Sequence, residues 1–366
     1  MNEIKKIAVM TGGGDCPGLN AVIRAVTKTA IMKYNLEVVG IKHGYRGLYL
    51  GGDEFVNLTL KNVEEIISKG GTILFSSNKD NLFDYTYEDE DGNLCHGDVS
   101  DIGIKHLKDN NIDALIVIGG DGTLTSGRDF ARKGVKIIGV PKTIDNDLAA
   151  TDTTFGFDTA VSNAVDAIDK LKTTAESHGR IIVVEAMGRY AGFLALSMGV
   201  SGAADVILIP EIEYDIDIVA EKIKSNLACG KNYSIVVVAE GAKPKGGKIF
   251  VSRVVEGSPD PIRLGGIAKA VAEELEKLVG IEARATILGH VQRGGSPTAN
   301  DRILSTRYGA FAVELLMQGK FGNMVTLNGS CMSYESLENA ISSNKSVDPN
   351  GELVTIAEAT GVSFGR

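Results

Sequence analysis

Cysteine is scarce in this 366-residue sequence, and its arrangement excludes two classes of site. The four cysteines are far apart and form no CxxC pair; they are Cys16, Cys95, Cys229 and Cys331. This spacing argues against a metal–thiolate site and against a disulfide framework. Unpaired cysteines fit a reducing compartment, so we expect a cytoplasmic protein.

Long apolar runs and an excess of basic residues are missing as well. No run of about 18 apolar residues occurs, so no membrane span is expected. The first residues do not resemble a secretory signal, because glycines and Asp15 interrupt the apolar stretch. The net charge of −9 argues against wrapping nucleic acid or coating an anionic membrane. An anionic small substrate stays compatible with it, since a local basic cluster can dominate one pocket.

Short apolar runs followed by amphipathic stretches are abundant, and they predict the fold class. Continuous β-branched runs are typical of parallel strands covered on both faces. The expected strands are 4–10, 36–41, 113–120, 135–140, 180–187, 204–210, 233–241 and 284–290. The alternation with helical patterns predicts an α/β fold with doubly wound, mostly parallel sheets, and the length suggests about two domains. Ligands of such sheets bind beyond the carboxyl ends of the strands.

One expected helix and two expected insertions complete the fold prediction. The stretch 158–172 has apolar residues at helical spacing, with Asp158 or Thr159 placed to cap its start. The acidic segment 78–100 and the Gly-, Pro- and Lys-rich segment 241–266 read as surface insertions. We expect no solenoid-type repeat.

Two glycine-rich loops follow expected strands. In "MTGGGDCPG", Gly12, Gly13 and Gly14 let the backbone approach an anion at a helix amino terminus, although a merely tight turn explains them equally well. In "GGDGT", one carboxylate, Asp121, stands among glycines, which suits a Mg²⁺ that keeps most of its waters and binds phosphate oxygens. The alternative for Asp121 is a helix cap, and Thr123 can also cap that helix.

The segment "PKTIDND" places Asp145 and Asp147 directly after a buried strand. Two close carboxylates repel each other unless a metal, a basic group or a substrate offsets the charge. Asp145 or Asp147 could accept a proton from an alcohol, and Thr143 could donate to a phosphate. A solvated acidic turn is the alternative.

Arginines and a histidine lie at or beside other strand ends. Arg189 follows "EAMG", and His290 and Arg293 lie in "LGHVQRGGSP". Arginine forks match phosphate groups in a bidentate manner, which favours a phosphorylated ligand. Arg180, Arg284 and Glu240 belong to the same set.

The motifs "GGDGT", "PKTIDND", "MGRYAGFLA" and "LGHVQRGGSPTANDR", in this order and spacing, resemble the 6-phosphofructokinase family. The resemblance runs from Ile4 to about Leu327. It implies transfer of the terminal phosphoryl group of Mg-ATP to the 1-hydroxyl of fructose 6-phosphate, giving fructose 1,6-bisphosphate and ADP in glycolysis. The extended tail and the 241–266 segment resemble the long-chain branch of the family, which uses mixed donors.

The resemblance also implies roles for individual residues. Asp145 would be the general base, Thr143 would support the transferring phosphoryl, Asp147 would orient the site, and Arg189 would stabilise the transition state. The implied nucleotide-binding residues are Gly14, Asn78, Lys79, Gly120, Asp121 with its Mg²⁺, Gly122 and Thr123. The implied sugar-phosphate residues are Thr143, Asp145, Arg180, Met187, Gly188, Arg189, Glu240, Arg284, His290 and Arg293. Arg180 and Arg284 would reach across from a neighbouring subunit, which implies a homo-oligomer, a homotetramer or a homodimer.

Two residues bear on the choice of phosphoryl donor. Gly122 leaves space for an α-phosphate where pyrophosphate users of the family carry Asp, so it favours ATP. Lys142 is typical of pyrophosphate users, so a reversible pyrophosphate-dependent enzyme is the alternative. A catalytically idle sensor of nucleotides or sugar phosphates is a third hypothesis. We expect a nucleotide-binding domain over 1–156 plus about 292–340, a sugar-phosphate domain over 157–291, and a C-terminal extension over 328–366 packed on the body.

Overall fold

The computed structural model describes residues 4–88, 92–254 and 262–366, which form two compact units. The first unit holds the chain up to Thr143 together with Leu148–Gly156 and Gly294–Asn344. The second unit holds Ile144–Asp147, Phe157–Arg293 and Lys345–Arg366. The short excursion Ile144–Asp147 therefore leaves the first unit and packs with the second.

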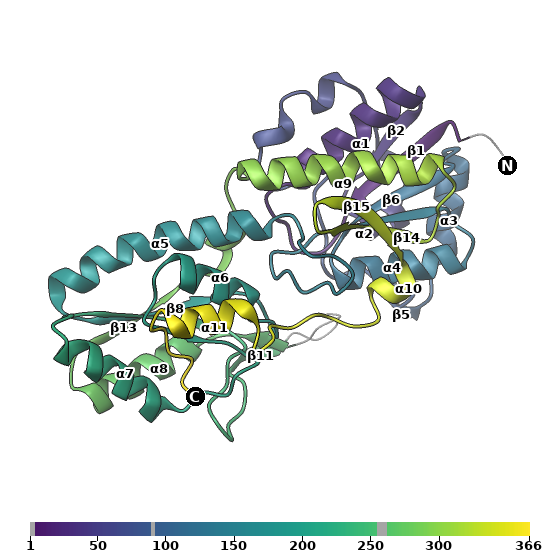
Figure 1. The fold of residues 1–366 in the computed structure, drawn as a ribbon. Coiled ribbons are helices and arrows are strands. Elements are labelled where there is room, and N and C mark those ends of the chain that lie inside the picture. The colour runs from purple at the N-terminus through teal and green to yellow at the C-terminus, as the bar shows by residue number, and fades with distance from the viewer. Residues whose placement is uncertain (1–3, 89–91, 255–261) are drawn as a thin grey trace. The chain divides into compact units, whose positions relative to one another are not determined.

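A seven-stranded sheet in the order β15-β14-β7-β6-β1-β2-β3 organises the first unit (Figure 1). β14, β7, β6, β1 and β2 run parallel, and the edge strands β15 and β3 are antiparallel to their neighbours. The strands are β1 (Lys6–Thr11), β2 (Glu37–Ile41), β3 (Phe55–Leu58), β6 (Ala114–Gly119), β7 (Ile137–Pro141), β14 (Asn323–Asn328) and β15 (Cys331–Ser336).

Helices cover both faces of this sheet. α1 (Leu19–Tyr34) and α9 (Ala299–Met317) pack side by side on one face. The other face packs against α2 (Tyr45–Leu50), α3 (Ser100–Asp109), α4 (Asp121–Arg132) and α10 (Leu337–Ala340). Short 3₁₀ turns η1 (Gly52–Glu54), η2 (Lys61–Val63) and η3 (Ile66–Ser68) and the hairpin of β4 (Tyr85–Glu88) and β5 (Leu94–Gly97) complete the unit.

The second unit is built on a parallel four-stranded sheet in the order β13-β8-β10-β9. Its strands are β8 (Ile181–Ala186), β9 (Val206–Leu208), β10 (Ser234–Ala239) and β13 (Ala283–Ile287). Its helices are α5 (Phe157–His178), α6 (Phe193–Ser201), α7 (Ile216–Ala228), α8 (Ile267–Val279) and α11 (Glu352–Ala359), with the 3₁₀ helix η4 (Gly289–Arg293) and the hairpin of β11 (Val251–Val254) and β12 (Ile262–Leu264).

Alternate residues of the strands of the second unit face opposite helix layers. In β8, Ile182 and Val184 pack with α5, α6 and α11, whereas Ile181 and Val183 pack with α7 and α8.

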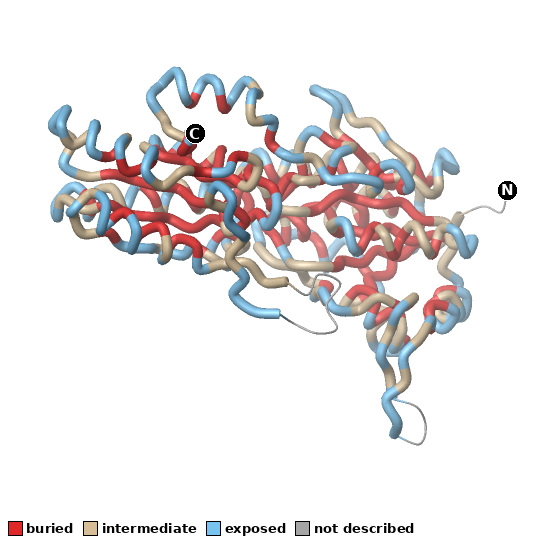
Figure 2. Tube along the Cα trace, turned by 90° about the horizontal axis from the view of Figure 1, so that it is seen from below, coloured by how far each residue is buried: buried red, intermediate tan, exposed pale blue. Residues whose placement is uncertain are grey.

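β8, β9 and β10 are buried at every position, whereas the edge strand β13 is mostly exposed. Figure 2 shows the buried interior segments and the exposed outer segments of the chain. A strand that is buried on both faces favours apolar residues at most positions, which explains its apolar run; the buried Glu185 of β8 accepts hydrogen bonds from the Gly266 and Ala268 N–H groups.

The structure confirms the predicted fold class and differs from the sequence-based expectations in detail. α5 begins at Phe157, so Asp158 and Thr159 lie in its first turn rather than at its cap. The region expected as an extension is divided, because β15 joins the first sheet and Lys345–Arg366 belongs to the second unit. The segments 78–100 and 241–266 each carry a hairpin, and residues 89–91 and 255–261 within them lie outside the described part. Each helix of the described chain is too short or too polar to cross a lipid bilayer.

Candidate active site

Three loops of the first unit meet at one edge of its sheet. β1, β6 and β7 are parallel neighbours, with Thr11 opposite Ile118 and Gly119 opposite Pro141. Their carboxyl ends therefore place the glycine loop after β1, the "GDGT" turn after β6 and Lys142–Thr143 after β7 side by side.

The glycines are required by how closely these loops approach. A Cβ added at Gly12 would lie 2.7 Å from Thr123 Cγ2, and one at Gly119 would lie 2.3 Å from Thr123 Cβ. Real Cβ atoms do not approach so closely, so no larger residue fits without rearrangement. The two turns thus form one continuous backbone surface with N–H groups near a helix start, which suits an anion.

A cavity of about 480 Å³ opens beside the first glycine loop. Gly13, Gly14 and Asn78 line it, so these predicted residues share one hollow; Lys79 is exposed and does not line it. The predictions missed the other lining residues, which are Asp15, His43, Thr72, Phe75 and Ser76.

His43 and Phe75 form an ordered aromatic pair in this cavity. Their rings stack with centroids 4.9 Å apart, and His43 Nδ1 lies 2.8 Å from Glu54 Oε2. His43 directly follows Lys42 at the end of β2. β2 is the parallel neighbour of β1, so the loops after the two strands lie at the same edge of the sheet. The position of His43 just after the expected strand "LEVVGI" could therefore have indicated this residue.

Asp121 lies in the first turn of α4, with Gly120 at the cap position. Neither Asp121 nor Thr123 is therefore the cap that the alternative interpretation required. Asp121 and Gly122 are exposed, and a Cβ added at Gly122 would meet no atom within 4 Å.

These features fit a magnesium ion that is shared with a phosphorylated ligand. Among the residues that the structure describes, no group of three His, Cys, Asp or Glu side chains is placed to hold a metal. Mg²⁺ usually takes one or two carboxylates and completes its shell with water and substrate phosphates. The exposed carboxylate of Asp121, at the start of α4 and beside the open space at Gly122, could supply one such ligand.

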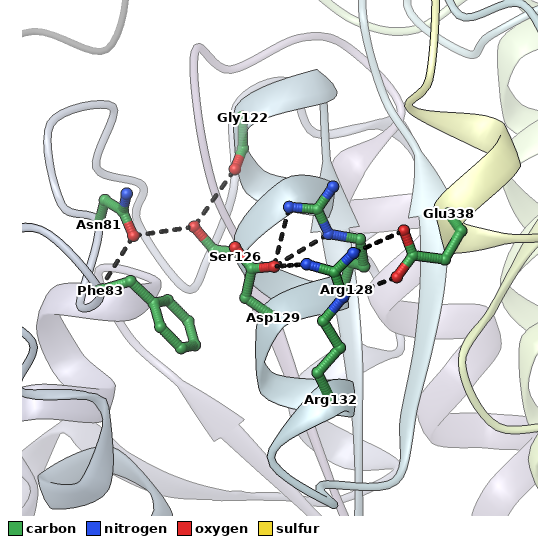
Figure 3. Close-up of polar contacts among 8 residues, drawn as sticks. All are labelled: Asn81, Phe83, Gly122, Ser126, Arg128, Asp129, Arg132 and Glu338. Atoms are coloured by element: carbon green, nitrogen blue, oxygen red, sulfur yellow. Dashed lines mark hydrogen bonds and ion pairs between the residues drawn. The ribbon is translucent and has the colours of Figure 1, made fainter.

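α4 is anchored along its length, which fixes the position of the "GDGT" turn (Figure 3). Ser126 Oγ bonds both the Gly122 carbonyl at 3.3 Å and Asn81 Oδ1 at 3.4 Å. Near the other end, Arg132 forms a two-pronged ion pair with Glu338 at 2.7 and 2.9 Å. The contacts with Asn81 and Glu338 thus tie α4 to two neighbouring segments.

Lys142 is buried, and its Nζ donates to the carbonyl of Gly14. A Cβ added at Gly13 would lie 3.3 Å from the same Nζ. The ammonium group of Lys142 therefore lies against the glycine loop.

The second unit gathers a separate set of polar groups at the carboxyl edge of its sheet. β8, β10 and β13 end beside one another, which places Met187–Arg189, Glu240 and His290 at one edge. The Arg189 N–H donates to Glu240 Oε1 at 3.0 Å, and the Met187 N–H donates to Gln292 Oε1 at 2.9 Å. Arg293 ends η4 at the same edge.

Asp145 joins this second set. Its side chain is only 6% exposed, which contradicts the solvated acidic turn. Burial raises the pKa of Glu240 to about 7, and the negative charges of Asp145 and Glu185 act in the same direction. N–H groups of Arg189 and Gly188 lower the pKa of Glu240 to a smaller extent. Two carboxyl groups close enough to interact therefore share this edge with Arg189.

The backbone around these groups is held in uncommon conformations. Asn146 and Arg189 have φ of 53° and 51°. Left-handed backbone at residues other than glycine is uncommon and tends to occur where the surrounding structure fixes a functional loop.

Arg180 and Arg284 lie at the opposite edge of the same sheet. Arg180 precedes β8, and Arg284 is the second residue of β13, where both bind Glu282. The six residues of β8 separate Arg180 from Met187, which puts the two residues about 23 Å apart along the strand. Within one chain these two arginines cannot join the Arg189 and Glu240 set.

Comparison with known proteins fits this arrangement of loops. The family model described as Phosphofructokinase matches residues 6–316. The chain belongs to the phosphofructokinase family. It is 62% identical to "ATP-dependent 6-phosphofructokinase 2" of Clostridium perfringens, covering 100% of this chain and 99% of the relative.

The names of the relatives of this phosphofructokinase include two phosphoryl donors, ATP and pyrophosphate. The "Pyrophosphate--fructose 6-phosphate 1-phosphotransferase" of Streptomyces coelicolor is 46% identical over 98% of this chain and 100% of its own. Among solved structures, phosphofructokinase from Saccharomyces cerevisiae matches with a TM-score of 0.80 at 30% identity, covering 92% of this chain and 45% of that chain.

The Glu240 carboxyl group yields a prediction about the stability of this phosphofructokinase. Because its pKa is raised from 4.5 to about 7, the native state keeps a proton that the unfolded chain has lost between these pH values. Stability should therefore fall as pH rises through this window. Glu240→Gln keeps an acceptor for the Arg189 N–H but cannot titrate. The drop in the free energy of unfolding across this pH window should therefore be about 1–3 kcal/mol smaller in the variant than in the wild type. Urea unfolding at pH 5 and pH 7.5 measures it, and equal pH dependence in both proteins would contradict the assignment.

Proposed function

We propose that this chain is an ATP-dependent 6-phosphofructokinase. It transfers the terminal phosphoryl of Mg-ATP to the 1-hydroxyl of fructose 6-phosphate, a reaction of glycolysis, and we propose that it acts in the cytoplasm. The identity of 62% over the full length with a relative named for this activity carries the proposal. The open space at Gly122 supports it, since a nucleotide needs room there that pyrophosphate does not.

The first unit would bind the donor. Backbone N–H groups of the glycine loop and the amino terminus of α4 would contact the phosphates, with Gly14, Asn78, Gly120, Gly122 and Thr123 as the nearest residues and Lys79 at the rim. Asp121 would hold Mg²⁺, which would neutralise part of the negative charge of the phosphates.

The second unit would bind the acceptor. His290, Arg293 and the backbone of Met187 and Gly188 would contact the sugar phosphate, and Glu240 would accept hydrogen bonds from sugar hydroxyls. Arginine forks and histidine ring N–H groups can donate hydrogen bonds to a phosphate group.

Asp145 would take the proton from the 1-hydroxyl as that oxygen attacks phosphorus. Its burial keeps water away, and Arg189 would neutralise charge on the transferring group. Thr143 would donate to the phosphoryl oxygens, and Asp147 would orient the site through its charge.

Product identification tests the proposal. Incubation with Mg-ATP and fructose 6-phosphate, followed by ³¹P NMR, should show fructose 1,6-bisphosphate and ADP in equal amounts. Binding of either ligand without any product would favour the idle sensor instead.

We further propose that the enzyme works as a homo-oligomer, a tetramer or a dimer, in which Arg180 and Arg284 complete the site of a neighbour. The two arginines lie at the opposite edge of the sheet from Arg189 and Glu240. They are therefore too far from the sugar-phosphate residues of their own chain to contact the same ligand. β13 is an edge strand, and near it Ile287 and Val291 are 59% and 66% exposed. An open strand edge with exposed apolar side chains favours association.

Complementation between two inactive variants tests the shared site. Asp145→Asn and Arg284→Ala should each be nearly inactive alone. Co-expressed chains that pair at random should regain about a quarter of wild-type activity, since one site of each mixed pair is intact. Activity of the mixture no higher than that of Arg284→Ala alone would show that each chain uses its own Arg284.

A further inference from the structure

A short C-terminal segment, Lys345–Val347, is bound to the loop that carries the two aspartates. Both belong to the second unit. The Lys345 N–H donates to the carbonyl of Asp147 at 2.8 Å. The side chain of Lys345 also reaches this loop, since its Nζ lies 3.4 Å from Asn146 Oδ1.

The segment is tied to the arginine loop as well. Lys345 Nζ lies 5.4 Å from the centroid of the Phe193 ring, and Phe193 begins α6 directly after the loop that carries Arg189. This distance is within the range of a cation–π interaction. Two residues on, the Val347 N–H donates to Glu211 Oε1 at 2.8 Å.

Glu211 joins this segment to the start of α6. The same oxygen, Oε1, accepts from the Gly192 N–H at 2.9 Å. Oε2 is buried and has no hydrogen-bond partner among the described residues. Because Glu211 accepts hydrogen bonds from the N–H groups of Gly192 and Val347, it holds the start of α6 and the C-terminal segment at a fixed distance from each other.

Asn146, the contact of Lys345, is the residue of the loop that most needs support. It stands between Asp145 and Asp147, its side chain is 7% exposed, and its φ is 53°. Asparagine tolerates the left-handed region better than other non-glycine residues, but this conformation is still less common than the ordinary regions, so buried contacts help to hold it. The ammonium group of Lys345 also lies next to a loop with two carboxylates, whose mutual repulsion a cation reduces.

We propose that Lys345 is a positioning residue for phosphoryl transfer. It holds Asn146 in its left-handed conformation through a charged side chain braced on Phe193, and so fixes the direction of the Asp145 carboxylate. Lys345 acts through Asn146 and makes no contact with substrate in this assignment. The inference rests on the proposed function of Asp145.

Steady-state kinetics of charge-removing variants test this role. Lys345→Met keeps the apolar stem over Phe193 and should lower kcat about ten- to a hundredfold, because small misplacement of a reacting group is costly. KM values for ATP and fructose 6-phosphate should stay within about twofold, since the binding residues are unchanged. Lys345→Arg retains the charge and the ring contact and should recover kcat to within about threefold.

A matched control is available in the first unit. Lys320 Nζ lies 5.5 Å from the ring of Tyr334, so Lys320→Met removes a similar contact elsewhere and should leave kcat unchanged. A kcat of Lys345→Met equal to that of the control would overturn the proposal. A rise in KM at constant kcat would also overturn it, because Lys345 would then bind substrate.

Hydrogen–deuterium exchange separates this inference from the proposed function. Amides of residues 144–148 should exchange at least about fivefold faster in Lys345→Met than in Lys320→Met, whatever reaction the protein catalyses. Unchanged exchange would refute the positioning role even in an active enzyme. If both Lys345→Met and Lys345→Gln fail to fold, Lys345 is needed for the fold itself and the proposal is wrong.

Discussion

Replacing Asp145 with Asn should lower kcat by about 10²- to 10⁴-fold, the usual contribution of a positioned general base. The amide keeps the shape of the carboxyl group but cannot take the proton of the sugar hydroxyl. Both KM values should change little, because the phosphate contacts come from other residues. A coupled assay that follows fructose 1,6-bisphosphate measures the effect.

Asp152→Asn is the matched control for this variant. Asp152 lies in the same stretch of chain, where its Oδ2 accepts from the Gly329 N–H at 2.6 Å, a structural contact. Its kcat should match that of the wild type. Near-normal turnover of Asp145→Asn would remove Asp145 from the role of base and would leave Asp147 as the remaining candidate in the loop.

Replacing Gly122 with Asp should abolish most ATP use without harming the fold. A Cβ at this position meets no atom within 4 Å, and an acidic residue in the first turn of a helix is favourable. The new charge would repel the triphosphate, so kcat/KM for ATP should fall by about 10²-fold. Gly122→Ala, which adds size without charge, should cost much less.

Two readouts make this variant decisive. Thermal melting should give a Tm close to that of the wild type, which separates donor rejection from unfolding. The kcat for saturating fructose 6-phosphate should be measured with both donors, since a smaller pyrophosphate donor would tolerate the side chain better. Unchanged ATP kinetics in Gly122→Asp would remove the steric and electrostatic account of donor choice.

Most of the predicted strands are buried on both faces, which makes their apolar runs continuous; β13, an exposed edge strand, is the exception. Each of the eight expected apolar runs contains or overlaps an observed strand, including β6 within 113–120 and β8 within 180–187. Three strands of the first sheet were missed: the edge strands β3 and β15, whose residues are half-exposed, and the interior strand β14, in which only residues 324–326 are buried. A helix between two successive strands returns the chain to the same end of the sheet, so the helical patterns between the runs predicted that the strands are parallel.

The motif residues were predictable because parallel strands bring their carboxyl ends to one edge. This placed Gly14 and Asp121 together in the first unit, and Arg189 and Glu240 together in the second. Sequence alone could not reveal Lys345, because its contact with Asn146 joins positions 199 residues apart. His43 was missed because its loop contains no motif, although β2 lies beside β1.

Gly122 and Lys142 bear on the phosphoryl donor in opposite directions. Gly122 is open, yet Lys142 is buried against the glycine loop, and relatives with either donor in their names are nearly half identical to this chain. The most direct measurement is the initial rate of fructose 1,6-bisphosphate formation with equal concentrations of Mg-ATP and Mg-pyrophosphate. We predict a rate at least about tenfold higher with ATP. A faster reaction with pyrophosphate, reversible on addition of phosphate, would contradict the assignment.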